Sequence, residues 1–252
     1  MTRKKKTSLF FLHGWAMTPA VWQPLIAAIG AFETHTPALP GHDGNIPFAA
    51  PALAAWADAL APALPLKATV IGWSLGALLA LELARIHPDR VERLILLGAT
   101  PRFVSTPDWP HGLDAATVSS FTDGYIGQPT QTLRRFLTLQ TLGETSRRQL
   151  LPQLEAVAVP HTGVPLPALV DGLKILTGSD LRPQLAEIRQ PVRLIHGSND
   201  ALMPLEAARR LTAALPCARL SVLEHCGHAL PLSRPNECAE IIRASLDERD
   251  EP

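Results

Sequence analysis

Short apolar runs recur along the chain and alternate with longer stretches of helical length. The apolar runs with strand character cover residues 8–12, 68–71, 94–97, 192–195 and 220–223, with a weaker candidate near 32–36. The stretches of helical length cover residues 22–29, 53–60, 75–86, 205–215 and 237–246. Such alternation predicts an α/β fold, with a mostly parallel sheet and helices on both of its faces. The nearly continuous apolarity of the runs indicates a sheet that is buried on both sides.

This alternation stops between about residues 101 and 183. No convincing strand occurs there, and the pattern instead predicts helices at 133–142, 146–157 and 167–176, separated by proline and glycine. An insertion of this size between two strands is typical of a lid above the carboxyl ends of the strands, where ligands bind in open α/β sheets. We therefore expect a core formed by residues 1–100 and 184–252 and a helical lid formed by residues 101–183.

Composition and charge argue against several other classes of protein. The 252 residues include 23 lysines and arginines and 23 acidic residues, so overall charge gives no support for nucleic-acid binding. The apolar stretch near the start is too short for a secretory signal, and no run approaches the roughly 20 apolar residues needed to cross a bilayer. Cys217, Cys226 and Cys238 form no C-x-x-C pair and fit reduced thiols that pack in the interior. We expect a soluble, cytoplasmic protein with neither a nucleic-acid nor a membrane partner.

The segment Gly72-Trp73-Ser74-Leu75-Gly76 directly follows one apolar run and leads into a helical stretch. A serine between two glycines is often only a turn residue. The strand–turn–helix context is, however, the one that a nucleophile elbow requires, in which the serine hydroxyl is presented above the sheet. We interpret Ser74 as a candidate nucleophile.

A serine nucleophile needs a histidine as base and a carboxylate that orients this histidine. In an elbow of this kind the expected order along the chain is serine, acid, histidine. Asp200 follows the run at 192–195 and His228 follows the run at 220–223, so both are expected at carboxyl ends of strands. The sequence therefore predicts a catalytic triad of Ser74, Asp200 and His228.

Other assignments of these roles remain open. Asp200 alone could cap a helix or form an Asx-turn. Asp180 and Glu224 are weaker candidates for the acid, because the first precedes the penultimate strand and the second lies at the edge of the last one. His225 is the alternative base. The segment His225-Cys226-Gly227-His228 resembles a pair of metal ligands, but it lacks a third convergent ligand, and no phosphate-binding glycine motif occurs, so we expect neither a metal nor another cofactor.

An acyl-transfer site also needs backbone N–H groups that stabilise the oxyanion of the tetrahedral intermediate. One is expected from Leu75, which follows the nucleophile, and a second from Trp15 in the loop after the first strand. Taken alone, His13-Gly14 could form a plain turn, but together with the elbow it favours the role in the oxyanion site.

These segments together resemble the α/β-hydrolase superfamily over nearly the whole chain. The segments that carry the resemblance are 12–15 (LHGW), 39–42 (LPGH), 72–76 (GWSLG), Asp200 with Pro204, and Gly227-His228. More narrowly, the chain is similar to the methyl ester esterases that act on pimeloyl-acyl carrier protein in biotin synthesis. The narrower resemblance is carried by Trp15, Trp73 and the segments 135–143 (RFLTLQTLG), 172–176 (GLKIL) and 180–182 (DLR).

The resemblance implies hydrolysis of the methyl ester of a pimeloyl group on acyl carrier protein, which gives a free carboxylate and methanol. It implies that Trp15, Trp73 and Phe136 line the substrate pocket and that arginines of the lid hold the carrier. The candidate arginines have only Glu144 as a nearby opposing charge; they are Arg134, Arg135, Arg147 and Arg148. Without the resemblance, such a cluster is usually a solvated helix face. Two alternatives stay open. The first is a carboxylesterase with broad specificity for small esters, or a related hydrolase that acts on another type of bond, and the second is a non-catalytic binding protein of the same fold.

Overall fold

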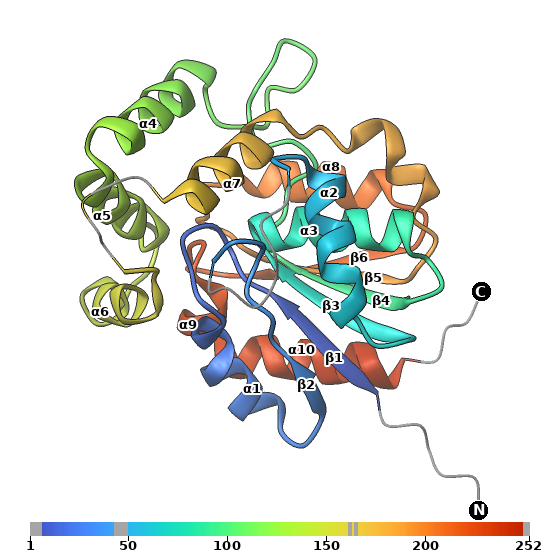
Figure 1. Cartoon of the computed structure of the whole chain (residues 1–252). Coiled ribbons are helices and arrows are strands. Elements are labelled where there is room, and N and C mark those ends of the chain that lie inside the picture. Colours follow the sequence, from blue (N-terminus) through green and yellow to red (C-terminus); the bar gives the residue numbers. More distant parts are fainter. Residues whose placement is uncertain (1–6, 43–49, 161–162, 164–165, 249–252) are drawn as a thin grey trace, which may run out of the picture.

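The computed structural model describes residues 7–42, 50–160, 163 and 166–248 (Figure 1). The basic cluster at the start of the chain and the charged end at 249–252 lie outside these residues. Within the described residues, none of the helices combines the length and the apolar character needed to cross a membrane.

Six parallel strands form one twisted sheet in the order β2-β1-β3-β4-β5-β6. The strands are β1 (Ser8–Leu12), β2 (Glu33–His35), β3 (Ala68–Trp73), β4 (Val91–Leu97), β5 (Val192–Gly197) and β6 (Ala218–Leu223). Each apolar run of strand character is a strand, and most strands extend one to three residues beyond the run. The strand order reverses between β1 and β3, so the carboxyl ends of these two strands flank the crevice where ligands bind in such sheets.

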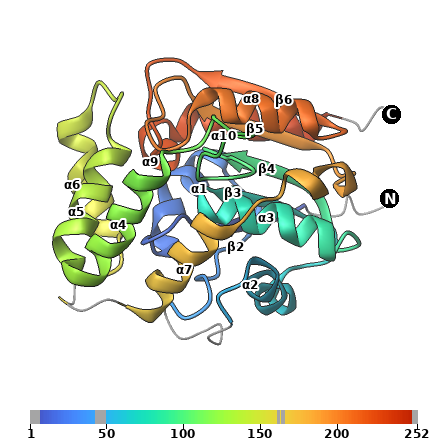
Figure 2. The same cartoon turned by 90° about the horizontal axis from the view of Figure 1, so that it is seen from above.

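Helices cover both faces of the sheet, as Figures 1 and 2 show. On one face α1 (Gln23–Ile29) packs against α10 (Pro235–Asp247), and on the other face α2 (Leu53–Leu60) packs against α3 (Leu75–Ile86). The helix α8 (Leu205–Ala214) lies on the same face as α3 and contacts β5 and β6. The two layers of helices explain why β3 is buried at every position.

The described residues between β4 and β5 contain no strand of the sheet and lie beyond the carboxyl ends of the strands (Figure 1). Its helices are α4 (Ala115–Gly127), α5 (Pro129–Gln140), α6 (Arg147–Val157) and α7 (Pro167–Gly178). Helix α4 was not predicted, because serines, threonines and glycines interrupt its apolar pattern. A short β-bridge between Arg102 and Asp180 joins the beginning and the end of this insertion.

The remaining helical elements are short. They are the short helix α9 (Leu230–Ser233) and the 3₁₀ helices η1 (Pro19–Trp22), η2 (Ala61–Ala63) and η3 (Arg182–Glu187).

Cys226 and Cys238 are buried, as expected for thiols that pack in the interior, but Cys217 is exposed and the packing prediction is wrong for it. All three thiols are free.

Candidate active site

Ser74 lies in the tight turn that joins β3 to α3. Its backbone has φ 58° and ψ −117°, a strained conformation for a residue with a side chain, and its N–H donates to Leu97 O at 3.1 Å. The turn is possible only with Gly76, because a Cβ there would collide with the carbonyl oxygen of Leu12 on β1. A Cβ at Gly72 would likewise collide with the backbone at Gly76. Close packing of this kind gives the geometry of a nucleophile elbow.

Asp200 lies in the loop after β5 and its carboxylate is fully buried. Oδ1 accepts hydrogen bonds from the N–H groups of Leu202 and Met203 at 2.9 and 2.8 Å, and Oδ2 lies 2.7 Å from His228 Nδ1. Burial opposes ionisation, but the charge of His228 and the hydrogen bonds that Asp200 accepts outweigh it and lower the pKa of this carboxyl below its ordinary value. Asp200 is therefore an ionised acceptor that orients His228.

His228 follows β6 and is buried beside Asp200. Its carbonyl oxygen accepts a hydrogen bond of 2.9 Å from the indole Nε1 of Trp73, and the two rings lie 5.6 Å apart. Its Nε2 has no hydrogen-bond partner among the described residues, and within the same residues no hydrogen bond joins it to Ser74. Ser74 nevertheless lies near this ring, because its N–H bonds to Leu97 and the next residue, Gly98, packs against the imidazole of His228. Hydrogen bonds between nucleophile and base often tighten only when substrate binds.

The alternative acids and base occupy different surroundings. Asp180 forms ion pairs with Arg102 and Arg182 at 2.6 and 2.7 Å, at the base of the insertion. Glu224 is exposed, and so is His225, whose backbone turns away with φ 55°. The structure therefore brings together Asp200 and His228, and it does not bring these alternatives to Ser74.

The two candidate oxyanion donors flank the elbow. Leu75 begins α3, and among the described residues neither its N–H nor that of Trp15 forms a hydrogen bond. His13 fixes the loop before Trp15, because its Nε2 accepts the N–H of Leu39 at 3.1 Å while Nδ1 lies 2.9 Å from Gly14 O. Burial, followed by the charge of His42, lowers the pKa of His13 to about 3, so this imidazole is neutral.

Comparison with known proteins assigns the fold to a family. A family model described as the alpha/beta hydrolase family matches residues 9–241. The chain belongs to the alpha/beta hydrolase family. An esterase structure from Exiguobacterium antarcticum superposes with a TM-score of 0.86 at 19% identity, covering 96% of this chain and 92% of the other.

Two curated relatives are similar over almost their whole length. The pimeloyl-[acyl-carrier protein] methyl ester esterase of Aromatoleum aromaticum is 48% identical over 94% of this chain and 97% of its own. The protein with the same name from Nitrosomonas europaea is 41% identical over 94% of both chains.

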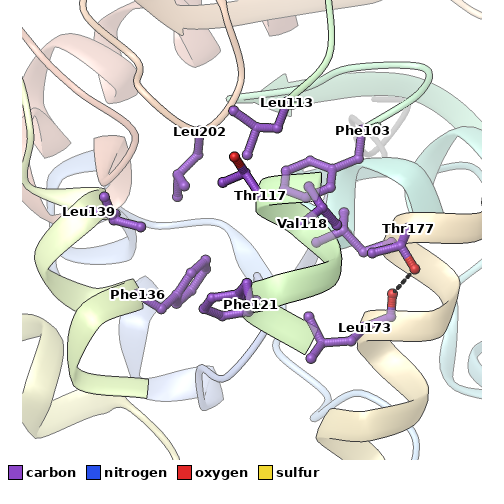
Figure 3. Close-up of a pocket in the computed structure, with 11 residues that line it drawn as sticks. Phe103, Leu113, Thr117, Val118, Phe121, Phe136, Leu139, Leu173, Thr177 and Leu202 are labelled. Atoms are coloured by element: carbon purple, nitrogen blue, oxygen red, sulfur yellow. Dashed lines mark hydrogen bonds between the residues drawn. The ribbon is translucent and has the colours of Figure 1, made fainter. Parts of the chain in front are cut away.

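The hydrolase has an apolar pocket beneath the helices of the insertion, shown in Figure 3. Phe121 from α4 and Phe136 from α5 lie side by side in it, Leu173 comes from α7, and Leu202 comes from the loop that follows Asp200. Almost all of its lining is hydrocarbon, so it suits an aliphatic chain.

Of the three residues expected in the substrate pocket, Phe136 lines this apolar pocket, whereas Trp15 and Trp73 are not among its lining residues. Trp15 packs edge-on against Phe136 at 4.9 Å, and its Nε1 donates to Leu169 O at 2.8 Å. Trp73 is buried and donates to the backbone of His228. That hydrogen bond was not predicted, because a contact between residues 155 positions apart leaves no signal in a single sequence.

The four candidate carrier-binding arginines are exposed on the hydrolase surface. Arg134 and Arg135 lie on α5, and Arg147 and Arg148 begin α6. The expectation that Glu144 opposes them is wrong. Its carboxylate is buried and accepts hydrogen bonds from Gly227 N at 2.8 Å and from the guanidinium of Arg234 at 3.2 Å.

The site contains no cluster of metal-binding side chains within the described part of the chain. Cys226 lies in the same loop as His228, but burial and then the nearby Glu144 carboxylate raise the pKa of its thiol to about 12. A thiol with this pKa stays protonated at neutral pH and is a poor nucleophile. The hydroxyl of Ser74 is thus the better candidate.

Proposed function

We propose that this hydrolase is a serine carboxylesterase that removes the methyl group from pimeloyl methyl ester bound to acyl carrier protein. The observation that carries the chemistry is the 2.7 Å hydrogen bond between Asp200 and His228 beside a serine in a nucleophile elbow. The substrate is inferred from the relatives named for this activity, which match almost the whole chain at up to 48% identity. The free thiols fit a cytoplasmic enzyme of biotin synthesis.

In the first half of the reaction, Ser74 Oγ bonds to the ester carbonyl carbon as His228 Nε2 takes its proton. The carbonyl oxygen becomes an oxyanion and accepts hydrogen bonds from the N–H groups of Trp15 and Leu75. The bond from the carbonyl carbon to the methoxy oxygen then breaks, and methanol leaves with the proton from His228. The acyl group remains esterified to Ser74.

In the second half, water attacks the acyl-enzyme and gives a proton to His228. The bond to Ser74 Oγ breaks, Oγ recovers the proton, and the pimeloyl carboxylate is released. Asp200 remains ionised throughout and stabilises the imidazolium that forms in each half.

The position of the apolar pocket fits a chain that carries its ester at the free end. The methyl ester of such a substrate reacts at Ser74, so the chain must extend from there toward the carrier. Phe136 contacts Trp15 and also lines the pocket, which connects the site to the pocket. Leu139 lines the same pocket and is 37% exposed, beside Arg134 and Arg135. We infer that the acyl chain emerges there and that arginines of α5 and α6 bind acidic or phosphate groups of the carrier.

The decisive experiment measures methanol release from pimeloyl methyl ester on the carrier and compares it with turnover of short aryl esters. We expect the enzyme to prefer the carrier-linked ester. The kcat of Ser74→Ala should be at least about 10³-fold lower than that of the wild type, and Ser119→Ala serves as the control. Rapid turnover of aryl esters without carrier activity would instead support the general carboxylesterase.

A test in cells separates the enzyme from a non-catalytic binding protein. Expression in a biotin-requiring strain that lacks its own methyl ester esterase should restore growth without biotin. Ser74→Ala should abolish this growth. Equal growth with the variant would contradict a catalytic role for Ser74.

A further inference from the structure

The turn between α5 and α6 packs against the loops that carry the candidate acid and base. Asn199, beside Asp200, donates from Nδ2 to Gly143 O at 3.4 Å. A Cβ at Gly227, beside His228, would collide with the carbonyl oxygen of Leu142. One turn of the insertion therefore contacts the neighbours of two residues that must meet for catalysis.

The carboxylate of Glu144 is the central polar group of this contact. Its side chain is fully buried, Oε1 accepts the N–H of Gly227 at 2.8 Å, and Oε2 accepts from Arg234 Nη1 at 3.2 Å. Arg234 in turn donates from Nη2 to His225 O at 3.1 Å. The carboxylate and the guanidinium thus hold both ends of the segment from His225 to Gly227, and His228 comes next.

Hydrogen bonds also restrain His228 itself. Its Nδ1 is bound to Asp200, and its carbonyl oxygen accepts from Trp73 and from the N–H of Leu230 at 2.9 Å. Glu144 holds the backbone immediately before it, at the N–H of Gly227. Hydrogen bonds to a charged acceptor are stronger than those between neutral groups, and a buried N–H left without a partner is strongly unfavourable. Catalytic groups need placement within about 0.5 Å of the productive geometry, so loss of this restraint would affect rate more than binding.

We propose that Glu144 is a positioning residue for His228. A carboxylate of the helical insertion fixes the histidine loop of the core, and the active site is therefore complete only when the α5–α6 turn is docked. This inference rests on the proposed serine chemistry but not on the identity of the ester.

The experiment compares Glu144→Ala and Glu144→Gln with Glu82→Ala. Glu82 is a matched control because it is also buried and paired with an arginine, Arg85 at 2.7 Å, but lies on α3 away from the elbow. We expect Glu144→Ala to lower kcat about 10–100-fold on free methyl esters and on carrier-linked ester alike, with KM within about twofold. Glu144→Gln keeps an oxygen that can accept the N–H of Gly227 and should recover most of the rate. Glu82→Ala should lose stability and keep its kcat.

Inactivation by phenylmethanesulfonyl fluoride gives a readout that needs no ester substrate. The rate constant for inactivation should fall in Glu144→Ala in parallel with kcat. If the wild-type enzyme reacts with the sulfonyl fluoride but ignores the carrier ester, the proposed substrate is wrong and the inference about Glu144 is still tested.

Several results would overturn the inference. They are wild-type kcat in Glu144→Ala, an equal loss of kcat in Glu82→Ala, no recovery in Glu144→Gln, or a wild-type enzyme that the sulfonyl fluoride does not inactivate. If Glu144→Ala does not fold, Arg234→Met replaces it, with an expected fall in kcat of about 2–10-fold at unchanged KM. An unchanged kcat in that variant would also count against the proposal.

Discussion

Ser74, Asp200 and His228 differ in how they are held in place. Ser74 is fixed by local backbone geometry, which glycines at 72 and 76 record in the sequence. His228 is fixed by groups distant along the chain, Trp73 and Glu144 among them, and no local pattern records these contacts. This difference explains why the sequence offers candidates for the reacting residues but no sign of the groups that hold His228 in place.

Trp73→Phe tests the hydrogen bond from the indole to the histidine loop. Phenylalanine keeps much of the buried ring but leaves the carbonyl of His228 with the N–H of Leu230 as its remaining donor, so we expect a loss of about 0.5–1.5 kcal/mol in the free energy of unfolding and about 10-fold in kcat. The control is Trp22→Phe, because Trp22 is equally buried and its Nε1 has no partner among the described residues. Equal effects of the two substitutions on kcat would contradict the assigned role.

His13 makes the stability of the enzyme sensitive to mild acid. Its pKa is about 3 in the folded protein and near 6.5 when the chain is unfolded, so below pH 6.5 only the unfolded state takes up the proton. The free energy of unfolding should therefore fall by about 2 kcal/mol from this residue between pH 8 and pH 5. In urea unfolding at several pH values, the free energy of unfolding should change less steeply with pH in His13→Gln than in the wild type. Identical slopes in the two proteins would contradict this explanation.

At the scale of elements, strands and core helices were predicted closely and the insertion less well. The first and last residues of β1, α2 and α3 were predicted correctly, because each element is apolar on the faces that are buried in the core. Helix α4 has only two buried residues, Val118 and Tyr125, so its sequence carries little periodic signal. Its packing partners, chiefly α5 and α7, stabilise a helix that its own sequence barely predicts.

The base of the insertion is closed by ion pairs around Asp180. Arg182 and Arg102 both bind this carboxylate, and the hydrogen bond from Arg182 is the main cause that lowers the pKa of Asp180 to about 2. Asp180→Asn should lower the free energy of unfolding by about 1–3 kcal/mol and speed tryptic cleavage within residues 101–183. Because the folded pKa is lowered, this stabilisation is present above pH 3.8 and is lost as the pH falls toward 2. The exposed Asp89→Asn is the control, and unchanged cleavage in Asp180→Asn would contradict a role as anchor.

For the whole molecule, the parallel sheet follows from the alternation of strands and helices, and the reversal of strand order places the elbow at the crevice. Specificity was harder to predict from the sequence, since the pocket combines side chains from five separate segments, four in the insertion and one in the core. The pattern of charges along the sequence was the weakest guide to side-chain pairing, because the partner of Glu144 is Arg234, which lies 90 positions away.

Docking of the carrier should depend on the exposed arginines of α5 and α6. Reversing the charge of Arg134, Arg135 and Arg148 should raise KM for carrier-linked ester by about 10-fold or more, with stronger effects at low salt, and leave free methyl esters unaffected. Arg147 is better tested alone, because its Nε also donates to Thr141 Oγ1 at 3.1 Å. The control reverses Arg209 and Arg210, which are exposed on α8. Equal losses on both substrates would indicate damage to the insertion instead.

The bridge between Arg102 and Asp180 has a consequence for how such enzymes diversify. Because the chain leaves and re-enters the sheet at neighbouring points, the excursion between them can be exchanged as a cassette while the catalytic scaffold keeps its register. A transplanted cassette would still have to supply an acceptor for the N–H of Gly227. Enzymes with a grafted insertion that lacks this acceptor should fold and yet catalyse slowly. This single requirement would therefore limit which insertions can give the enzyme new substrates.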